Sequence, residues 1–515
     1  MEQLLNNHII IIDFGSQYTQ LIARRIREFN VYSEIVPFSE DPKNILSKNP
    51  IGLILSGGPS SVYEKDAPKI SNELLMKDIP VLGICYGMQL LIEVYDGKIG
   101  NSKNREYGTA ELNHNGLSKL FNDVSNSTQV WMSHGDHLDK NPKGFKIDAK
   151  SKDNVPAAIS SEDGKKYGIQ FHPEVTHTIE GDRILNNFIF EICNAKSDWT
   201  SESFIQNQIK IIREIVGNAK VVCGVSGGVD STVTVKLLYE AIGQNVIPVF
   251  IDNGLLRKNE FEIVKSMFKE KMNLPINAFN KRKHFLNKLK GVKNPEKKRK
   301  IIGREFIRVF EKISKKYDNL EFLAQGTLYP DIIESVSIKG PSVTIKSHHN
   351  VGGLPKKLNL KLIEPLKELF KDEVREIGRS LKVPEDVLMR HPFPGPGLAV
   401  RILGDITNSK LKLLKEVDAI FIDELYLQRL YDSTWQAFAV LLPVKSVGVM
   451  GDKRTYQRAV ALRAVSSKDG MTAEWTEFPN KFLRRVSTRI VNEVPGINRV
   501  VYDISNKPPS TIEWE

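Results

Sequence analysis

Short apolar runs alternate with amphipathic segments through the N-terminal part of the chain. Apolar runs of strand length predict β-strands at residues 9–13, 52–56, 81–84 and 167–171. Apolar positions that recur at helical spacing predict α-helices at residues 18–28, 88–95 and 183–193. Strands that alternate with helices in this way are typical of a parallel α/β sheet, whose functional loops lie at the carboxyl ends of the strands.

The pattern becomes polar over residues 195–203, which predicts a linker, and α/β alternation then resumes. The strands of this second α/β part are predicted at residues 220–225, 246–251 and 321–324. A cluster of proline and glycine at residues 391–397 indicates a further boundary. Beyond it, helices are predicted at residues 417–426 and 432–441, and strands at 446–450, 456–465 and 499–504. We therefore predict two parallel-sheet α/β domains and a C-terminal α+β domain, at residues 1–196, 197–390 and 391–515.

Length and composition agree with a globular protein of several domains. The 515 residues exceed what one hydrophobic core holds, and 41% of them are hydrophobic and 26% charged. Three cysteines, far apart and odd in number, do not make a disulfide framework, which indicates a reducing compartment. No run reaches the ~20 apolar residues that span a membrane, and the N-terminus lacks a signal-peptide pattern. We therefore expect a cytoplasmic protein with no membrane partner.

The net charge of +11 raises the question of an anionic partner. Basic residues are concentrated at 281–300, where ten of the twenty positions are Lys or Arg. Such a run is usually a solvated helical face, and the other interpretations are nucleic-acid binding and a field that attracts nucleotide phosphates. Aromatic residues that stack on bases do not interleave with these charges. We therefore expect no nucleic-acid partner.

The motif Ser-Gly-Gly-Val-Asp-Ser at 226–231 lies between a predicted strand and a predicted helix. Backbone N–H groups and the helix dipole at such a turn can hold an anion. No Gly-Lys-Ser/Thr follows, so this is not a Walker A motif. It resembles the pyrophosphate loop of enzymes that split ATP into AMP and pyrophosphate, and an ordinary glycine-rich turn is the alternative. Asp230 is a candidate ligand of Mg²⁺. The candidate ATP-binding residues are Ser226, Gly227, Gly228, Val229, Asp230, Ser231 and Thr232.

A second constellation centres on Cys85, which follows a predicted strand and precedes a predicted helix in Gly-Ile-Cys-Tyr-Gly-Met-Gln. A sharp turn here exposes the sulfur, and the helix N-terminus favours the thiolate. Downstream, the strand at 167–171 ends in His-Pro-Glu, and residues two apart in an extended segment share a side, so Glu174 can orient His172. The predicted chemistry is acyl transfer from a carboxamide: Cys85 attacks, His172 moves the proton, and ammonia leaves from a thioester. Taken singly, each motif has a plain alternative, a small buried hydrophobe or a turn.

Ser-Gly-Gly-Pro at 56–59 supplies a candidate oxyanion hole, in which the N–H groups of Gly58 and Tyr86 would face the developing charge. Together, Ser-Gly-Gly-Pro, Gly-Ile-Cys-Tyr-Gly-Met-Gln and Phe-His-Pro-Glu resemble the class I, triad-type glutamine amidotransferases. The resemblance implies a flavodoxin-like domain that takes ammonia from glutamine. A polar turn is the alternative for residues 133–136. The glutamine-binding residues that the resemblance implies are Gln89, Ser133, His134, Gly135 and Asp136.

Segments beyond the phosphate loop are similar to the family of glutamine-hydrolysing GMP synthetases, nearly to the end of the chain. They lie at residues 326–331, 346–355, 390–401 and 507–515. The resemblance implies an adenine-nucleotide-hydrolase-like ATP pyrophosphatase domain and a C-terminal dimerisation domain in a homodimer. The implied reaction converts xanthosine monophosphate (XMP), ATP, glutamine and water to GMP, AMP, pyrophosphate and glutamate, with Mg²⁺ neutralising the phosphates.

The C-terminal tail is a candidate XMP-binding segment. Lys507 suits the nucleotide phosphate, Glu513 suits a purine N–H, and the alternating residues 511–515 predict an edge strand. The candidate XMP-binding residues are Arg299, Lys346, Lys507, Ile512 and Glu513. Asp331 is a second candidate metal ligand, for which a capped helix start is the alternative.

Two other functions compete with a glutamine-dependent synthetase. An ATP pyrophosphatase that acts on tRNA or another carbonyl acceptor would explain the positive charge. For tRNA thiolation it would need sulfur-carrying cysteines near the phosphate loop, where only Cys223 lies, and it leaves the domain of Cys85 without a role. A non-catalytic sensor of glutamine or nucleotides is disfavoured by the intact Cys85, His172 and Glu174.

Overall fold

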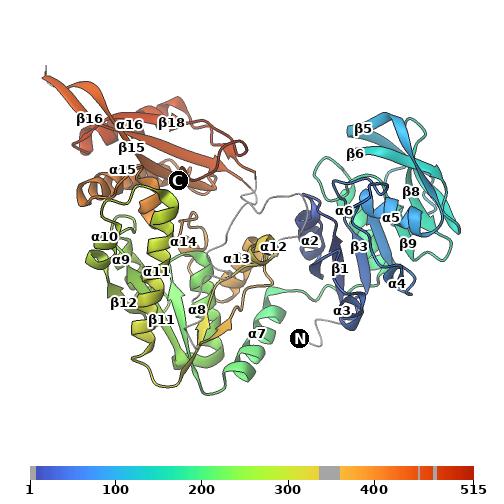
Figure 1. Ribbon diagram of the computed structural model, residues 1–515, viewed down its shortest axis with the longest axis horizontal. Helices are drawn as coiled ribbons and strands as arrows, with labels where there is room; N and C mark the ends of the chain where they lie inside the picture. Colours follow the sequence, from blue (N-terminus) through green and yellow to red (C-terminus); the bar gives the residue numbers. More distant parts are fainter. Residues whose placement is uncertain (1–6, 336–359, 451–452, 468–471) are drawn as a thin grey trace. The chain divides into compact units, whose positions relative to one another are not determined.

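The computed structural model describes residues 7–335, 360–450, 453–467 and 472–515. The chain forms two compact units, of which unit 1 begins at Met1 and extends to Asn207, and unit 2 begins at Gln208 (Figure 1). The domain limits at residues 196 and 390 stay predictions. None of the described helices has the length and apolar character needed to cross a membrane.

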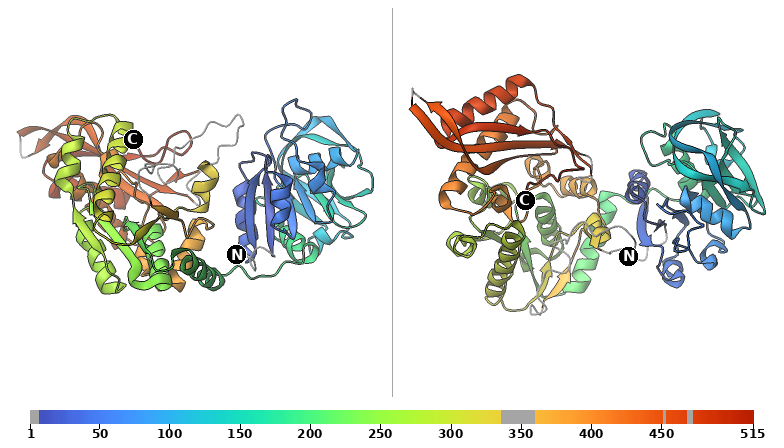
Figure 2. Two further views of the ribbon diagram at one scale, coloured as in Figure 1. Left: turned by 60° about the horizontal axis from the view of Figure 1, so that its bottom comes forward. Right: turned by 45° about the horizontal axis from the view of Figure 1, so that its top comes forward.

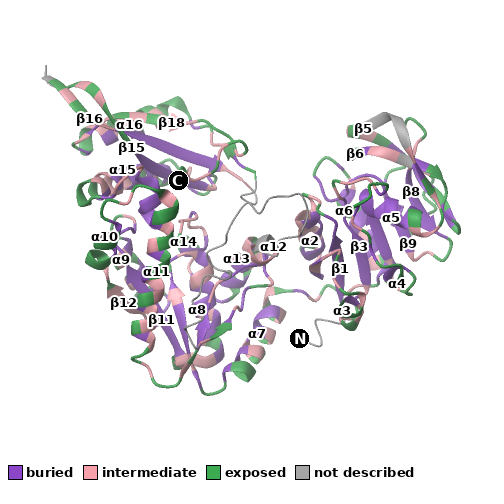
Figure 3. Ribbon diagram, viewed as in Figure 1, coloured by how far each residue is buried: buried purple, intermediate pink, exposed green. Residues whose placement is uncertain are grey.

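Unit 1 is built on one nine-stranded sheet with the order β2-β1-β3-β4-β9-β8-β7-β5-β6. The first five strands in this order are parallel and have the flavodoxin-like order, which confirms the predicted parallel sheet. Four of them correspond to predicted strands, and the strand at Tyr32–Pro37 was not predicted. The five strands are β2 (Tyr32–Pro37), β1 (His8–Asp13), β3 (Gly52–Leu55), β4 (Val81–Ile84) and β9 (Lys166–Ile169). Every residue of β1, β3 and β4 is buried, because helices cover both faces of a parallel sheet (Figure 3).

An antiparallel half continues this sheet and was not predicted from the sequence. Its strands are β8 (Pro156–Ser161), β7 (Phe145–Ser151), β5 (Lys98–His114) and β6 (Ser127–Lys140). β7 has no strict alternation of buried and exposed positions, and three of its seven residues are charged, so it lacks the apolar pattern that identifies a strand. The helices of unit 1 are α2 (Thr19–Glu28), α3 (Pro42–Ser47), α4 (Asn72–Leu75), α5 (Tyr86–Val94) and α6 (Gly181–Asn186).

Unit 2 contains a parallel five-stranded sheet with the order β12-β11-β10-β13-β14. The chain leaves β10 toward β11 on one side and returns to β13 on the other, so the strand order reverses at β10. A ligand crevice is expected at the carboxyl ends of the strands at such a switch point. The strands are β10 (Lys220–Val225), β11 (Val246–Asp252), β12 (Asn277–Asn280), β13 (Leu320–Ala324) and β14 (Lys361–Ile363).

Helices surround this sheet, and Figure 2 shows it from two further directions. The helices are α8 (Val229–Ile242), α9 (Glu260–Ser266), α10 (Arg282–Leu289), α11 (Pro295–Ser314), α13 (Lys371–Ser380) and α14 (Glu385–Leu388). α7 (Ser201–Val216) leads from unit 1 into unit 2, and α12 (Tyr329–Ser335) follows β13.

The C-terminal part of unit 2 is an α+β layer, as predicted. Two helices, α15 (Asn408–Leu427) and α16 (Asn480–Glu493), pack on a sheet of four strands and share one apolar core with it. The strands are β15 (Gln436–Met450), β16 (Lys453–Ser466), β17 (Glu474–Trp475) and β18 (Ile497–Asp503).

The helix predicted at residues 432–441 is wrong, because residues 436–441 are the first part of β15. They pair with β16 and have apolar neighbours on both faces: Ala437 and Ala439 contact the helices, and Phe438 and Val440 belong to a second cluster. A strand buried on both faces has no polar alternation, so its period does not distinguish it from a buried helix.

Candidate active sites

Cys85 lies at the junction of β4 and α5 with a backbone φ of +53° and ψ of −107°. A non-glycine residue in this region carries about 1–3 kcal/mol of strain and persists only where its surroundings impose it. Glycines on either side make the turn possible. A Cβ on Gly83 would lie 2.5 Å from the carbonyl oxygen of Gly87, and a Cβ on Gly87 would collide with the backbone of Leu55. This is the sharp turn that the sequence predicts at Cys85.

His172 lies beside Cys85 and is held by Glu174. His172 Nδ1 is 2.7 Å from Glu174 Oε1, and both side chains are buried. Burial lowers the pKa of His172, but the charge of Glu174 and the hydrogen bonds to Cys85 and Glu174 outweigh it and raise the pKa to about 10. With Nδ1 directed at Glu174, Nε2 is the ring nitrogen left for the sulfur. The three residues therefore form a nucleophile, a proton carrier and an orienting carboxylate.

The segment that carries His172 is fixed by one hydrogen bond to β6 and by another from Thr178 in the turn that follows it. The N–H of His172 donates to the carbonyl of Trp131 at 3.0 Å, and the hydroxyl of Thr178 donates to the carbonyl of His172 at 2.5 Å. Gln170, which the sequence analysis did not single out, donates from Nε2 to Cys85 Sγ at 3.7 Å. The signal was present in the sequence, because Gln170 is two residues before His172 and so shares its side of the extended segment.

The predicted oxyanion and glutamine-binding residues surround this cluster. A Cβ on Gly58 would lie 3.3 Å from the ring of Tyr86, and one on Gly57 would lie 3.2 Å from Cε1 of His172, so the glycine turn packs directly against the site. Tyr86 is the first residue of α5 and Gln89 is buried one turn later. The predicted Gly58 and Tyr86 are thus brought to the same place as Cys85.

The segment 133–136 lies on β6 and reaches the sulfur through its backbone. Cys85 Sγ is 3.9 Å from the carbonyl oxygen of Ser133, and His134 Nδ1 is 2.8 Å from the carbonyl oxygen of Asp136. The carboxylate of Asp136 accepts from the hydroxyl of Ser61 at 2.9 Å, and Gly135 lies between these residues. The segment is therefore part of the wall around Cys85.

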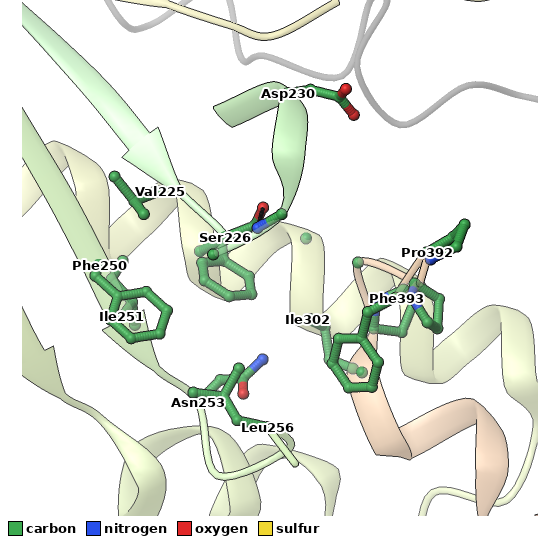
Figure 4. Close-up of a pocket in the computed structure, with 18 of the residues that line it drawn as sticks. Val225, Ser226, Asp230, Phe250, Ile251, Asn253, Leu256, Ile302, Pro392 and Phe393 are labelled. Carbon is green, nitrogen blue, oxygen red and sulfur yellow. Dashed lines mark hydrogen bonds between the residues drawn. The ribbon is translucent and has the colours of Figure 1, made fainter. Parts of the chain in front are cut away.

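In unit 2 the motif 226–231 forms a loop at the carboxyl end of β10 (Figure 4). Gly227 has φ +79°, and a Cβ there would lie 2.6 Å from Val264 Cγ2, so only glycine fits. Ser226 Oγ accepts from the N–H of Gly228 at 3.2 Å and lies 3.0 Å from Ser231 Oγ. α8 then begins at Val229 with no capping side chain, so the N–H groups of its first turn are available to an anion.

The loop opens into a cavity of about 1120 Å³, which lies entirely within unit 2. Its volume exceeds the usual range for a single small-molecule site, so it has room for more than one ligand. Phe250, Ile251, Leu256, Ile302 and Phe393 give it an apolar wall, visible in Figure 4. The cations that line it are Arg257, Arg299, Lys300, Arg304, Arg308, Lys371 and Arg390.

Two cations from distant segments contact the loop directly. Arg390 donates from Nη1 to the carbonyl of Gly227 at 2.6 Å and from Nη2 to Glu260 at 2.6 Å. Lys371 Nζ pairs with Asp230 Oδ1 at 2.5 Å. Sequence analysis did not assign Lys371, because its contact with Asp230 joins residues that are 141 positions apart in the chain.

The metal and XMP candidates fall in different places. Within the described residues, no group of three or more His, Cys, Asp or Glu is arranged to hold a metal. Asp230 lines the cavity, whereas Asp331 does not and accepts from the N–H of Leu328 at 3.0 Å. Arg299 lines the cavity and pairs with Glu296 at 2.6 Å. Lys346 lies outside the described residues.

The basic run at 281–300 separates into different environments. Lys298 is fully buried and donates to the carbonyls of Ala399 and Ile402 at 3.0 and 2.7 Å. Arg299 and Lys300 line the cavity. Part of the run therefore faces a space suited to phosphates rather than open solvent.

The C-terminal tail is held by buried cations. Arg401, with a fully buried side chain, donates to both carboxylate oxygens of Glu513, at 3.1 and 2.8 Å. Gln436 donates to the same carboxylate at 2.9 Å. Arg463, also fully buried, donates to the carbonyl of Ile512 at 3.3 Å, and Lys298 pairs with Glu515. The tail thus provides counter-charges for two buried cations, Arg401 and Lys298. For the third, Arg463, it provides a carbonyl acceptor, and the ion-pair partner of Arg463 is Asp503 of β18.

This arrangement corrects the edge strand predicted at residues 511–515, which have no strand structure. The side chains of buried cations form hydrogen bonds and ion pairs with the carbonyls and carboxylates of the tail, so these residues do not pair with a neighbouring strand. Lys507 pairs through its backbone with Ala473, at 2.7 and 3.0 Å, and Ile512 packs beside Phe438. Lys507, Ile512 and Glu513 do not line the cavity.

Comparisons with known proteins agree with this division. The family model of class-I glutamine amidotransferases matches residues 10–192, that of NAD synthase matches residues 200–299, and that of the GMP synthase C-terminal domain matches residues 423–514. A curated protein of Helicobacter pylori named GMP synthase [glutamine-hydrolyzing] is 57% identical over 98% of this chain and 100% of its own length. Proteins of the same name from Sulfurimonas denitrificans and Wolinella succinogenes are each 55% identical, over 99% and 98% of this chain and 100% and 98% of their own lengths. The chain therefore belongs to the family of glutamine-hydrolysing GMP synthases.

Proposed function

We propose that unit 1 hydrolyses glutamine to glutamate and ammonia, and that unit 2 uses ATP and this ammonia to convert XMP to GMP. The C2 oxygen of XMP attacks the α-phosphorus of ATP, and pyrophosphate leaves. Ammonia then attacks C2 of the adenylated purine, and AMP leaves. The observation that carries the proposal is one chain with two separate sites, a buried Cys85–His172–Glu174 cluster and a phosphate loop at a sheet switch point.

In the glutaminase, Cys85 is the nucleophile. Its thiol proton passes to Nε2 of His172, and the sulfur attacks the carboxamide carbon of glutamine. The N–H groups of Gly58 and Tyr86 stabilise the oxyanion, while Gln89 and the segment 133–136 hold the substrate. His172 then protonates the leaving ammonia, and water hydrolyses the thioester.

Glu174→Gln is expected to lower the rate of glutamine hydrolysis by about 10³-fold, because it removes the charge that orients His172 and stabilises its imidazolium. The pKa of His172, about 10, lies above its ordinary 6.5, so the pair stabilises unit 1 fully below about pH 6.5 and this contribution is lost as the pH rises toward 10. The variant lowers this pKa, so its residual activity declines at a lower pH on the alkaline side. A glutaminase pH–rate profile measures the shift, and an unchanged alkaline limb contradicts this role of Glu174.

In the synthetase, the phosphate loop with residues 226–232 binds the phosphates of ATP, and the apolar wall of the cavity accommodates its adenine. Asp230, a hard oxygen donor at the loop, would hold Mg²⁺, with Asp331 as a second candidate. The ion would neutralise the charge of the phosphates. Because no carboxylate cluster is present in the described residues, phosphate oxygens and water would supply most of its ligands.

Asp230→Ala is expected to lower XMP-dependent pyrophosphate release by at least about 100-fold, because the phosphates lose their positioning at the loop. Glutamine hydrolysis in unit 1 is expected to persist. Asp331→Ala in parallel distinguishes the two metal candidates. Pyrophosphate release measured against Mg²⁺ concentration gives the result, and wild-type activity in Asp230→Ala removes this residue from the mechanism.

For XMP, we propose binding by Arg299, Lys346, Lys507, Ile512 and Glu513. The support is that Arg299 lines the cavity and that two hydrogen bonds from Arg401 orient the carboxylate of Glu513. A carboxylate held in this way accepts well from the N–H groups of a purine.

We further propose a homodimer formed through the C-terminal layer. Val447 and Tyr456 are directly paired across β15 and β16 and are 44% and 60% exposed, and Val449 is 75% exposed. Apolar side chains grouped in this way mark an interaction surface. Sedimentation velocity of the wild type and Val449→Asp measures the association.

The cytoplasm is the proposed compartment, since all three cysteines are free thiols and Cys85 acts only when reduced.

An ATP pyrophosphatase that transfers sulfur to tRNA is not favoured. Cys223, the cysteine nearest the loop in sequence, is buried in β10, and burial raises its pKa to about 12. Such a thiol does not carry sulfur.

The decisive assay supplies XMP, ATP and Mg²⁺ with either glutamine or ammonium. Formation of AMP, pyrophosphate and GMP supports the proposal, and formation of ADP or no guanine nucleotide overturns it.

A further inference from the structure

The sulfur of Cys85 has a polar neighbour, Gln170, that has no part in the proposed reaction. Gln170 Nε2 lies 3.7 Å from Cys85 Sγ, and Gln170 is only 2% exposed. Besides His172, the sulfur also contacts the carbonyl oxygen of Ser133 at 3.9 Å. An N–H donor favours the thiolate, whereas a carbonyl acceptor favours the thiol. Gln170 is therefore placed to stabilise the anion.

Backbone pairing fixes Gln170 in this position. β4 and β9 are neighbouring parallel strands in which Ile84 pairs with Ile169, so the residues that follow each strand lie side by side. The N–H of Cys85 donates to the carbonyl of Ile169 at 2.8 Å, and the N–H of Gln170 donates to the carbonyl of Ala157 at 2.9 Å. The amide group and the sulfur are thus held by the same sheet, with no mobile loop between them.

We propose that Gln170 donates a hydrogen bond from Nε2 to the Cys85 thiolate and thereby stabilises the nucleophile and fixes the direction of its attack. A buried anion needs donors that replace water. His172 supplies one donor after it takes the proton, and Gln170 supplies the second. This inference rests on the proposed role of Cys85 as the glutaminase nucleophile. It assigns to Gln170 an effect on the sulfur rather than on the binding of glutamine.

The test uses two variants. Gln170→Met removes the N–H donor and keeps a side chain of similar length, and Gln170→Glu places a negative charge beside the sulfur. Gln129→Leu, at an exposed glutamine on β6, is the matched control. Alkylation of Cys85 by iodoacetamide is measured from pH 5 to pH 10, with the labelled peptides quantified by mass spectrometry. Cys193 and Cys223 are internal references, because burial raises the pKa of both thiols.

For Gln170→Met, the midpoint of the alkylation profile is expected to rise by about one pH unit, and the rate at pH 7 to fall about tenfold. For Gln170→Glu the rise is larger, because the carboxylate opposes the thiolate. The kcat of glutamine hydrolysis falls by about 10–100-fold with KM nearly unchanged. GMP formation from ammonium stays at the wild-type level in both variants, which shows that unit 2 is intact.

An unchanged alkylation profile overturns the inference, whether or not glutamine hydrolysis falls. A rise in KM alone also overturns it, since that result assigns Gln170 to glutamine binding. These failures differ from failure of the proposed function, in which the wild-type protein itself does not hydrolyse glutamine.

Discussion

Replacing Cys85 by alanine is expected to lower glutamine-dependent GMP formation by about 10⁴-fold or more, because loss of the nucleophile removes the covalent route entirely. Ammonium-dependent GMP formation is expected to remain within about twofold of the wild type. The reason is structural: the contacts of Cys85 lie within unit 1, whereas the phosphate loop and its cavity lie within unit 2. Initial rates with saturating XMP and ATP, and either nitrogen source, give both numbers.

Cys193→Ala is the matched control, since Cys193 is another buried, free cysteine of unit 1. It is expected to retain glutamine-dependent activity. Loss of both the glutamine and the ammonium reaction in Cys85→Ala contradicts two separable sites. Survival of the glutamine reaction removes Cys85 as the nucleophile.

Glu513→Ala is expected to destabilise unit 2 by about 3–5 kcal/mol, because it leaves Arg401 as an unpaired charge in the core. The side chain of Arg401 is 0% exposed, and Glu513 accepts from two of its nitrogens. Urea unfolding followed by pulse proteolysis measures the loss, since fragments of the two units are separated by size. A shift of less than about 1 kcal/mol contradicts the structural role of this pair.

Glu477→Ala, at an exposed acid of the same layer, is the control and is expected to change stability by less than about 0.5 kcal/mol. The double variant Arg401→Met with Glu513→Leu removes both charges and is expected to regain most of the stability. It also separates the two proposed roles of Glu513. If Glu513 binds XMP, the double variant is stable but has a raised KM for XMP, whereas a normal KM restricts Glu513 to the core.

The parts of the fold that could be predicted from the sequence are those with a strong local signal. β1, β3 and β4 are short apolar runs buried on both faces, and the glycines on either side of Cys85 predict the sharp turn there. For the first part of β15 the sequence pattern predicts a helix, over residues 432–441, because two covered faces remove the alternation that marks a strand. The charged strands β5 to β7 gave too weak an apolar pattern to be recognised.

The same limit applies to the sites. The Cys85 cluster and the phosphate loop are contiguous motifs, so each was located from the sequence. Lys371 and Arg390 reach that loop from more than 140 residues further along the chain, a separation that no local pattern encodes. The counter-charges of Arg401 and Lys298 are likewise supplied by a tail whose partners become evident only when the chain is folded.

The backbone of Cys85 has one consequence for the evolution of this enzyme. Its positive φ is a conformation that glycine adopts without cost, so the position is more stable without the side chain that performs the chemistry. A library of variants selected for heat resistance alone would accumulate glycine there and lose the ability to use glutamine. The reactive thiol is retained only while the cell depends on glutamine as a nitrogen source, and growth on abundant ammonium relaxes that requirement.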